Sequence, residues 1–204
     1  MPEAPKEIRF SLAPVRLGLM QESEMSDAQK TAVKSIMSGP RGHMGGPFSA
    51  LLRSPELMNR VQKVGEYLRF QCPIDKRLGE FAAIIAARHW SQQFEWWAHR
   101  KQAIEAGLKA DIADAVAEGR RPTGMREDEE VLYDFLMEAL KNQGVCDTTY
   151  ARAVKQYGEA GIIDLLAVAG YYGLLALVMN VARTPVPDGP ALPLPGLPVR
   201  ATPL

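Results

Sequence analysis

The chain has 204 residues, of which 24% are charged and 47% hydrophobic, a composition that suits one globular domain with a sizeable core. Its 24 basic residues balance 24 acidic ones, which argues against nucleic acid or an anionic membrane as a partner. Cys72 and Cys146 lie far apart, outside any C-x-x-C spacing, so a disulfide framework is not expected. No secretory signal is visible at the N-terminus, and we expect a cytoplasmic protein.

The first helix signal is the capping-box spacing of Ser26-Asp27-Ala28-Gln29, which predicts a helix from there to about Met37. Glycine and proline residues in segment 39–47 cannot continue a helix interior, and we predict a loop there. Ser54-Pro55-Glu56 then opens a second helix, because serine caps well and proline is tolerated at the first helical position. A third helix is predicted from Pro73 onward.

The pattern stays helical through the rest of the chain. The third helix runs to about His89 and is interrupted near Trp90-Ser91-Gln92, and the helix that follows ends at Gly107, a residue able to adopt the left-handed cap conformation. Further helices are predicted over 111–117, 127–142 and 147–157. Because strand signals are scarce, the predicted fold class is all-α.

Leu165 to Ala182 contains no charged residue and is about as long as the ~18-residue threshold for a membrane-spanning helix. Asp164 and Arg183 flank it, and polar and glycine residues interrupt it. We therefore predict a buried helix of a soluble protein, with a membrane span as the alternative.

The composition changes abruptly after Thr184, where prolines recur to the end of the chain. This tail is expected to be extended, and either disordered or laid as an arm over a neighbouring surface. The predicted organisation is therefore an N-terminal extension (1–25), a helical domain (26–184) and a proline-rich tail (185–204). No zinc, calcium or phosphate-loop spacing is present, and we predict no metal site and no cofactor.

Ionisable residues in apolar surroundings are the best candidates for chemistry. Glu95 and His99 stand four residues apart, so on a helix their side chains share a face and can meet. Glu80 lies in an Ala/Ile-rich stretch, where burial would raise its pKa and make it a usable acid or base. The alternative is an ordinary helix-surface pair, with Glu80 bonded to a backbone group.

Three segments of the chain resemble the carboxymuconolactone decarboxylase family, which includes the alkylhydroperoxidase D-like proteins. They are Gly46-Pro47-Phe48-Ser49-Ala50-Leu51-Leu52 before a Ser-Pro-Glu-Leu helix start, Glu80 to His99 with Glu-Trp-x-x-His, and Gly161 to Asn180. The resemblance implies an all-helical, alkylhydroperoxidase D-like fold assembled into homo-oligomers, such as trimers or hexamers.

In the peroxidase branch of that family, a glutamate precedes a C-x-x-C pair and a histidine. Carried onto this chain, the pattern places the glutamate at Glu80 and the histidine at His99, whereas Gln92 and Glu95 occupy the cysteine positions. Neither residue can provide a thiolate, so thiol peroxidase activity is not expected. Phe94-Glu95-Trp96-Trp97-Ala98-His99 instead is similar to decarboxylase-like members.

The resemblance thus implies a cofactor-free lyase that acts on a small carboxylated lactone or related cyclic compound. His99 would donate a proton after carbon dioxide leaves, with Glu95 fixing its tautomer and Glu80 completing a relay. Arg41 would receive a substrate carboxylate, unless it is an exposed loop arginine. Phe48 and Trp96 are predicted to contact substrate. An antioxidant protein and a non-catalytic oligomeric binding protein are the alternatives.

Overall fold

The computed structural model describes residues 14–187 and 193–196, and over these ranges the chain is built of helices without strands. This confirms the predicted all-α class. A 3-10 turn, η2 (Glu22–Glu24), comes before the α-helices. These are α1 (Asp27–Ser38), α2 (Pro47–Leu51), α3 (Pro55–Phe70), α4 (Lys76–His89), α5 (Gln93–Glu105), α6 (Ala110–Ala117), α7 (Glu127–Asn142) and α8 (Asp147–Ala182).

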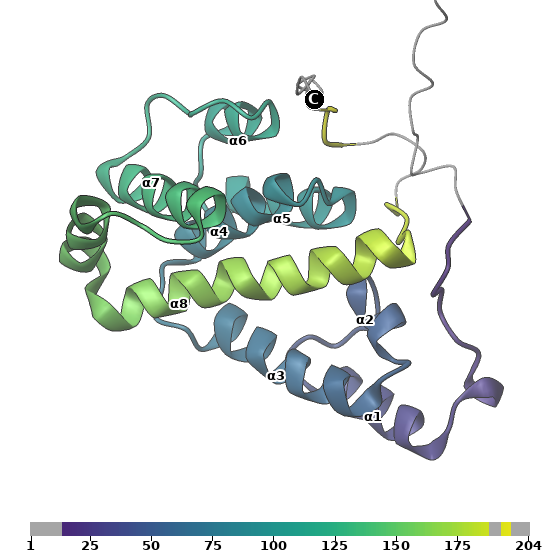
Figure 1. Cartoon of the computed structure of the whole chain (residues 1–204). Helices are drawn as coiled ribbons and strands as arrows, with labels where there is room; N and C mark the ends of the chain where they lie inside the picture. The colour runs from purple at the N-terminus through teal and green to yellow at the C-terminus, as the bar shows by residue number, and fades with distance from the viewer. Residues whose placement is uncertain (1–13, 188–192, 197–204) are drawn as a thin grey trace, which may run out of the picture.

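Helix α8 runs through the middle of the fold, with α1 to α3 on one side and α4 to α7 on the other (Figure 1). It packs against α2, α3, α4, α5 and α7. The sequence predicted a helix over 147–157 and a separate apolar helix from Leu165. Only Gly158 departs from helical geometry, with φ of 71°, so α8 is bent at one residue instead of being interrupted by a linker.

The length and hydropathy of α8 alone would allow it to cross a membrane, and no other described helix passes that test. Its most apolar window has a mean hydropathy of 2.0, and 56% of that window is buried inside the protein. A single helix of this kind is weak evidence for a membrane span, because core helices of soluble proteins have the same composition. The central packing of α8 is consistent with the predicted buried helix.

The helix starts follow the capping signals in the sequence. The Ser26 hydroxyl accepts a hydrogen bond from the Gln29 amide, and the Gln29 side chain accepts one from the Ser26 amide, which forms the expected capping box. Asp75 caps α4 through the Arg77 amide. The short helix α2 was missed, because Pro47 ends the predicted loop and also occupies the first turn of a helix.

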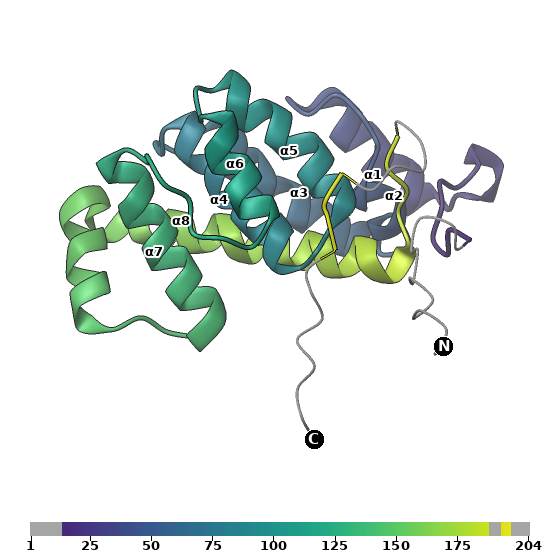
Figure 2. The same ribbon diagram turned by 90° about the horizontal axis from the view of Figure 1, so that it is seen from above.

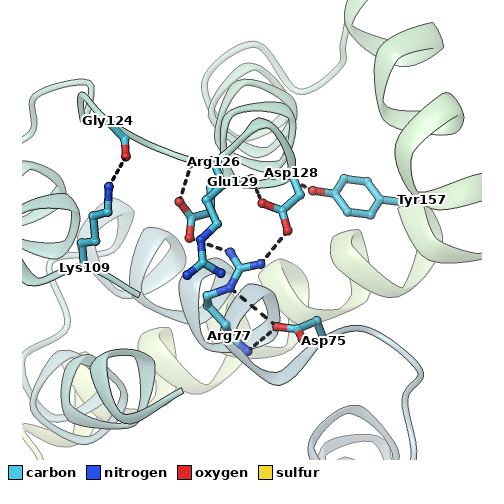
Figure 3. A network of polar contacts seen from close by, with 8 residues as sticks. All are labelled: Asp75, Arg77, Lys109, Gly124, Arg126, Asp128, Glu129 and Tyr157. Atoms are coloured by element: carbon cyan, nitrogen blue, oxygen red, sulfur yellow. Dashed lines mark hydrogen bonds and ion pairs between the residues drawn. The ribbon is translucent and has the colours of Figure 1, made fainter. Parts of the chain in front are cut away.

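A network of charged residues joins the start of α4 to the start of α7 (Figure 3). The buried Arg77 guanidinium lies 2.5 Å from Glu129 and 2.5 Å from Asp128. Glu129 also accepts a hydrogen bond from the Arg126 amide at 2.7 Å. The Tyr157 hydroxyl donates to the Asp128 carbonyl, which brings α8 into the same network. Arg77, Asp128 and Glu129 each have a partner, and with Tyr157 they tie three helices together.

Part of the proline-rich tail packs on the domain as an arm. The Leu194 side chain is buried, and its backbone exchanges two hydrogen bonds with Gln93, at 2.8 and 3.2 Å. The Pro195 carbonyl accepts a hydrogen bond from Arg88 at 2.8 Å. This favours the arm over the disordered alternative for residues 193–196 (Figure 2).

The remaining stretches of the predicted extension and tail lie outside the described residues; these are 1–13, 188–192 and 197–204. The domain boundaries at 25 and 184 stay predictions.

Candidate functional site

A cavity of about 970 Å³ lies where α2, α3, α5 and α8 meet. The chain segments on either side of the helical domain also reach it, since Leu17 and Leu19 contribute from the N-terminal side and Pro185 and Pro187 from the C-terminal side. Its walls are mostly apolar and aromatic, with a few ionisable side chains among them, which is the composition of a small-molecule site.

His99 on α5 is held by Glu80 on α4. Its Nδ1 lies 2.6 Å from the Glu80 Oε2, and both side chains are buried. The Tyr172 ring meets the imidazole edge-on, with 4.5 Å between ring centroids. Because Glu80 occupies Nδ1 and fixes the ring, Nε2 is the nitrogen left for a ligand in the cavity that His99 lines.

Glu95 is 2% exposed, and neither of its carboxyl oxygens has a hydrogen-bond partner among the described residues. Burial raises its pKa well above the ordinary value of 4.5, which favours the protonated acid. It lines the same cavity as His99. A buried carboxyl without a partner can donate a hydrogen bond or a proton to a ligand.

The predicted Glu95–His99 pairing is wrong. The two residues are close on α5, as the four-residue spacing required, but His99 takes Glu80 as its partner. The start of α5 explains how Glu95 is placed. The buried Gln92 side chain caps the helix by accepting a hydrogen bond from the Glu95 amide at 2.8 Å. Gln92 therefore acts on the backbone, while the Glu95 side chain has no partner in the part of the chain that the structure describes.

Arg41 and Phe48 both line the cavity, where the sequence predicted substrate contacts. The Arg41 guanidinium carbon lies 4.5 Å from the centre of the Phe48 ring, and the guanidinium donates a hydrogen bond to the Tyr171 hydroxyl at 3.4 Å. Gly46, with φ of 54°, immediately precedes α2 and allows close packing, because a Cβ there would lie 2.6 Å from the Phe94 ring.

The placement of Trp96 in the site does not fit the structure. Trp96 is 1% exposed and belongs to the hydrophobic core, whereas its neighbour Trp97 lines the cavity. Neighbouring residues on a helix point about 100° apart, and on α5 this turns Trp97 toward the cavity and Trp96 toward the core. Arg69, Tyr171 and Tyr172 also line it and were not predicted. The Gly-Tyr-Tyr sequence within the third resembling segment was the available signal for the two tyrosines.

Neither a protein-family model nor a curated protein matches this sequence. A solved structure from Agrobacterium tumefaciens does align with it, with a TM-score of 0.60 and 16% sequence identity over 67% of this chain and 94% of that one. That crystal structure is of a protein of unknown function, described as a candidate antioxidant defence protein, AhpD. The chain has an AhpD-like fold. At this identity the likeness extends to the fold alone.

The described part of the chain contains no group of three His, Cys, Asp or Glu residues able to hold a metal ion. Its cysteines are both free thiols, and neither Cys72 nor Cys146 lines the cavity. Burial raises the pKa of the Cys72 thiol, which disfavours the reactive thiolate. The ionisable groups at the cavity are therefore carboxyl, imidazole, guanidinium, ammonium and phenol groups.

Proposed function

We propose that this protein is a cofactor-free acid–base enzyme, a carbon–carbon lyase of the carboxymuconolactone decarboxylase type. Its substrate would be a small carboxylated lactone or a related cyclic compound. The observation that carries the proposal is the buried Glu80–His99 pair at a cavity wall that also holds the unpartnered Glu95.

The chemistry assigns a separate task to each residue. When the bond to the leaving carbon dioxide breaks, its electron pair passes to the remaining carbon and is delocalised toward the lactone carbonyl. Protonated Glu95 would donate a hydrogen bond to that carbonyl oxygen as it gains charge. His99, oriented by Glu80, would then deliver a proton from Nε2 to the carbon, which typically contributes about 10²- to 10⁴-fold in rate. Solvent would return the proton to the imidazole.

This assignment changes the role predicted for each of the two glutamates. Glu80, which was expected to complete a relay, is the group that fixes the imidazole. Glu95, which was expected to fix the tautomer, has a carboxyl with no hydrogen-bond partner among the described residues. In both versions no cofactor or metal takes part.

A direct test measures carbon dioxide release and lactone consumption for a panel of carboxylated lactones, with wild type and His99→Ala. We expect release by wild type and a loss of about 10²- to 10⁴-fold in His99→Ala. His89→Ala is the matched control, because His89 lies on α4 outside the cavity lining. Equal rates for wild type and His99→Ala would remove His99 from the mechanism, and no release from any lactone would contradict the lyase.

Thiol peroxidase activity is the second candidate, because the aligned structure from Agrobacterium tumefaciens is described as a candidate antioxidant defence protein. We disfavour it, since Gln92 and Glu95 stand where the peroxidase pattern has cysteines. A non-catalytic binding protein of the same fold is the third. A cavity that binds small acids without changing them would favour it.

We also propose that the protein is a cytoplasmic homo-oligomer, a trimer or hexamer as the family resemblance implies. An exposed apolar stripe along α8, formed by Ile163, Leu174, Leu177 and Val181, supports an oligomer, because monomers rarely leave such faces uncovered. Neither nucleic acid nor a membrane is a proposed partner.

A further inference from the structure

Two arginines reach the cavity from different parts of the chain. Arg41 belongs to the loop before α2, and Arg69 lies in the last turn of α3. Arg41 donates a hydrogen bond to the Tyr171 hydroxyl at 3.4 Å, and Arg69 donates one to the Gln102 side-chain oxygen at 3.0 Å. Both acceptors are neutral groups. Within the described ranges neither arginine forms an ion pair with a carboxylate.

Gly65 on α3 lies against both the Arg41 guanidinium and the Tyr171 hydroxyl. A Cβ on Gly65 would lie 3.0 Å from the Arg41 Nη2 and 2.0 Å from the Tyr171 hydroxyl oxygen, so both groups pack directly on this position of α3. Arg69 stands four residues later on the same helix and therefore shares a face with Gly65. Burial lowers the pKa of Arg41, and the positive charge of Arg69 adds to that effect.

Arg41 and Arg69 combine the lack of a carboxylate partner among the described residues with a place at the cavity. Six described arginines, Arg60, Arg77, Arg100, Arg120, Arg121 and Arg152, each lie within 4.0 Å of a carboxylate. At the cavity itself, Lys101 pairs with Glu105 at 3.8 Å. Glu95 is not the missing partner, because both of its carboxyl oxygens lack a hydrogen bond to any described residue and its protonated form is favoured.

Two cations in a half-buried site repel each other unless an anion joins them. We propose that Arg41, Arg69 and the Tyr171 hydroxyl form a recognition site for the carboxylate of a small organic acid. This inference deepens the proposed function and rests on it, because it names the group by which the ligand is held. Guanidinium groups suit a planar carboxylate, which they can bind through paired hydrogen bonds.

The walls of the cavity indicate which chemical group the acid carries besides its carboxylate. Phe48, Phe94 and Trp97 line it, so a flat, apolar or aromatic ring can pack there while its carboxylate meets the arginines. Glu95 and His99 then remain for another polar atom of the same ligand. A phosphate group is also an anion that arginines bind, so a test has to distinguish a carboxylate ligand from a phosphate ligand.

Calorimetry can measure how tightly the full chain binds benzoate, its neutral isostere benzamide and phenyl phosphate. These three affinities distinguish a carboxylate site from a phosphate site. We expect benzoate to bind at least about tenfold more tightly than benzamide, because a charged hydrogen bond contributes about 1.5–3 kcal/mol. Benzoate should also bind more tightly than phenyl phosphate, and added salt should weaken it. Arg41→Gln and Arg69→Gln should each weaken benzoate by about tenfold or more, with partial rescue by Arg69→Lys.

Arg60→Gln is the matched control, because Arg60 is an exposed arginine of the same helix α3 and should leave benzoate affinity unchanged. Equal affinity for benzoate and benzamide, or an unchanged affinity in Arg69→Gln, would overturn the inference. So would tighter binding of phenyl phosphate than of benzoate, or no benzoate binding at millimolar concentration.

His99→Ala separates this inference from the proposed function. Benzoate binding that persists in His99→Ala, without carbon dioxide release by wild type, would contradict the lyase and leave the carboxylate site standing. Carbon dioxide release that is unaffected by Arg41→Gln and Arg69→Gln would contradict the carboxylate site and leave the lyase standing.

Discussion

Helix α4 supplies two buried polar residues three positions apart, and they enter clusters of opposite character. Arg77 enters a network in which Glu129, Asp128 and Tyr157 all have partners (Figure 3). Glu80 instead pairs with His99 at the cavity, where the Glu95 carboxyl has no hydrogen-bond partner among the described residues. Buried polar groups are normally satisfied, so the first cluster is built for stability, and the second keeps capacity that a ligand can use.

Breaking the satisfied cluster should have the largest effect on stability. Arg77→Met removes a buried guanidinium and leaves Glu129 buried without its cation, so we expect a loss of about 3–5 kcal/mol in the free energy of unfolding. Denaturant unfolding measures this. Arg100→Met is the control, because the Arg100–Asp114 pair is solvent-exposed and its loss should cost about 0–1 kcal/mol. Similar losses in both variants would refute the difference between buried and exposed pairs.

Two helical glycines, Gly65 beside the cavity and Gly79 on α4, differ in the space available for a side chain. An alanine Cβ at position 65 would meet the Tyr171 hydroxyl at 2.0 Å, whereas one at position 79 meets nothing within 4 Å. We expect Gly65→Ala to destabilise the protein by about 1–3 kcal/mol through overpacking. Gly79→Ala should instead stabilise it by about 0.5–1 kcal/mol through helix propensity. Thermal unfolding of both variants would show whether the two substitutions change stability in opposite directions.

The unpartnered carboxyl should make stability depend on pH. Burial raises the pKa of Glu95 well above 4.5, so the folded protein holds this proton more tightly than the unfolded chain does. The resulting stabilisation is complete below the unfolded pKa and is lost as pH rises through the folded pKa. Relative to wild type, Glu95→Gln should therefore gain free energy of unfolding with rising pH across that window. A constant difference between them would be contrary to this prediction, and the exposed Glu159→Gln serves as control.

The smallest expected effect concerns the thiols. Peroxide reduction with a dithiol donor should stay at background for wild type, and Cys72→Ser and Cys146→Ser should change nothing, because neither thiol lines the cavity. Robust turnover that either substitution abolishes would show instead that the chain is a thiol peroxidase.

The helices were predictable because their signals are local. Ser26 with Gln29 and the turn at residues 90–92 fix helix ends through contacts a few residues long. The His99–Glu80 pair was not predictable in this way, because the two residues lie 19 positions apart and meet only when α4 and α5 pack together. Spacing within one helix pointed to Glu95 instead.

Other parts of the site depend on packing in the same way. Trp96 and Trp97 carry identical side chains, and only the orientation of α5 decides which faces the cavity. Arg69 has no motif around it, and its importance rests on Gly65, Arg41 and Tyr171 meeting from three distant segments.

A crystal structure of wild type with a bound carboxylated lactone analogue would test the central claim most directly. We predict that the analogue's carboxylate lies between Arg41 and Arg69, and that its carbonyl oxygen accepts a hydrogen bond from Glu95. The carbon that is to be protonated should face the His99 Nε2. A ligand bound elsewhere, or one that leaves both Glu95 oxygens unpartnered, would contradict the claim that this cluster is kept open for chemistry.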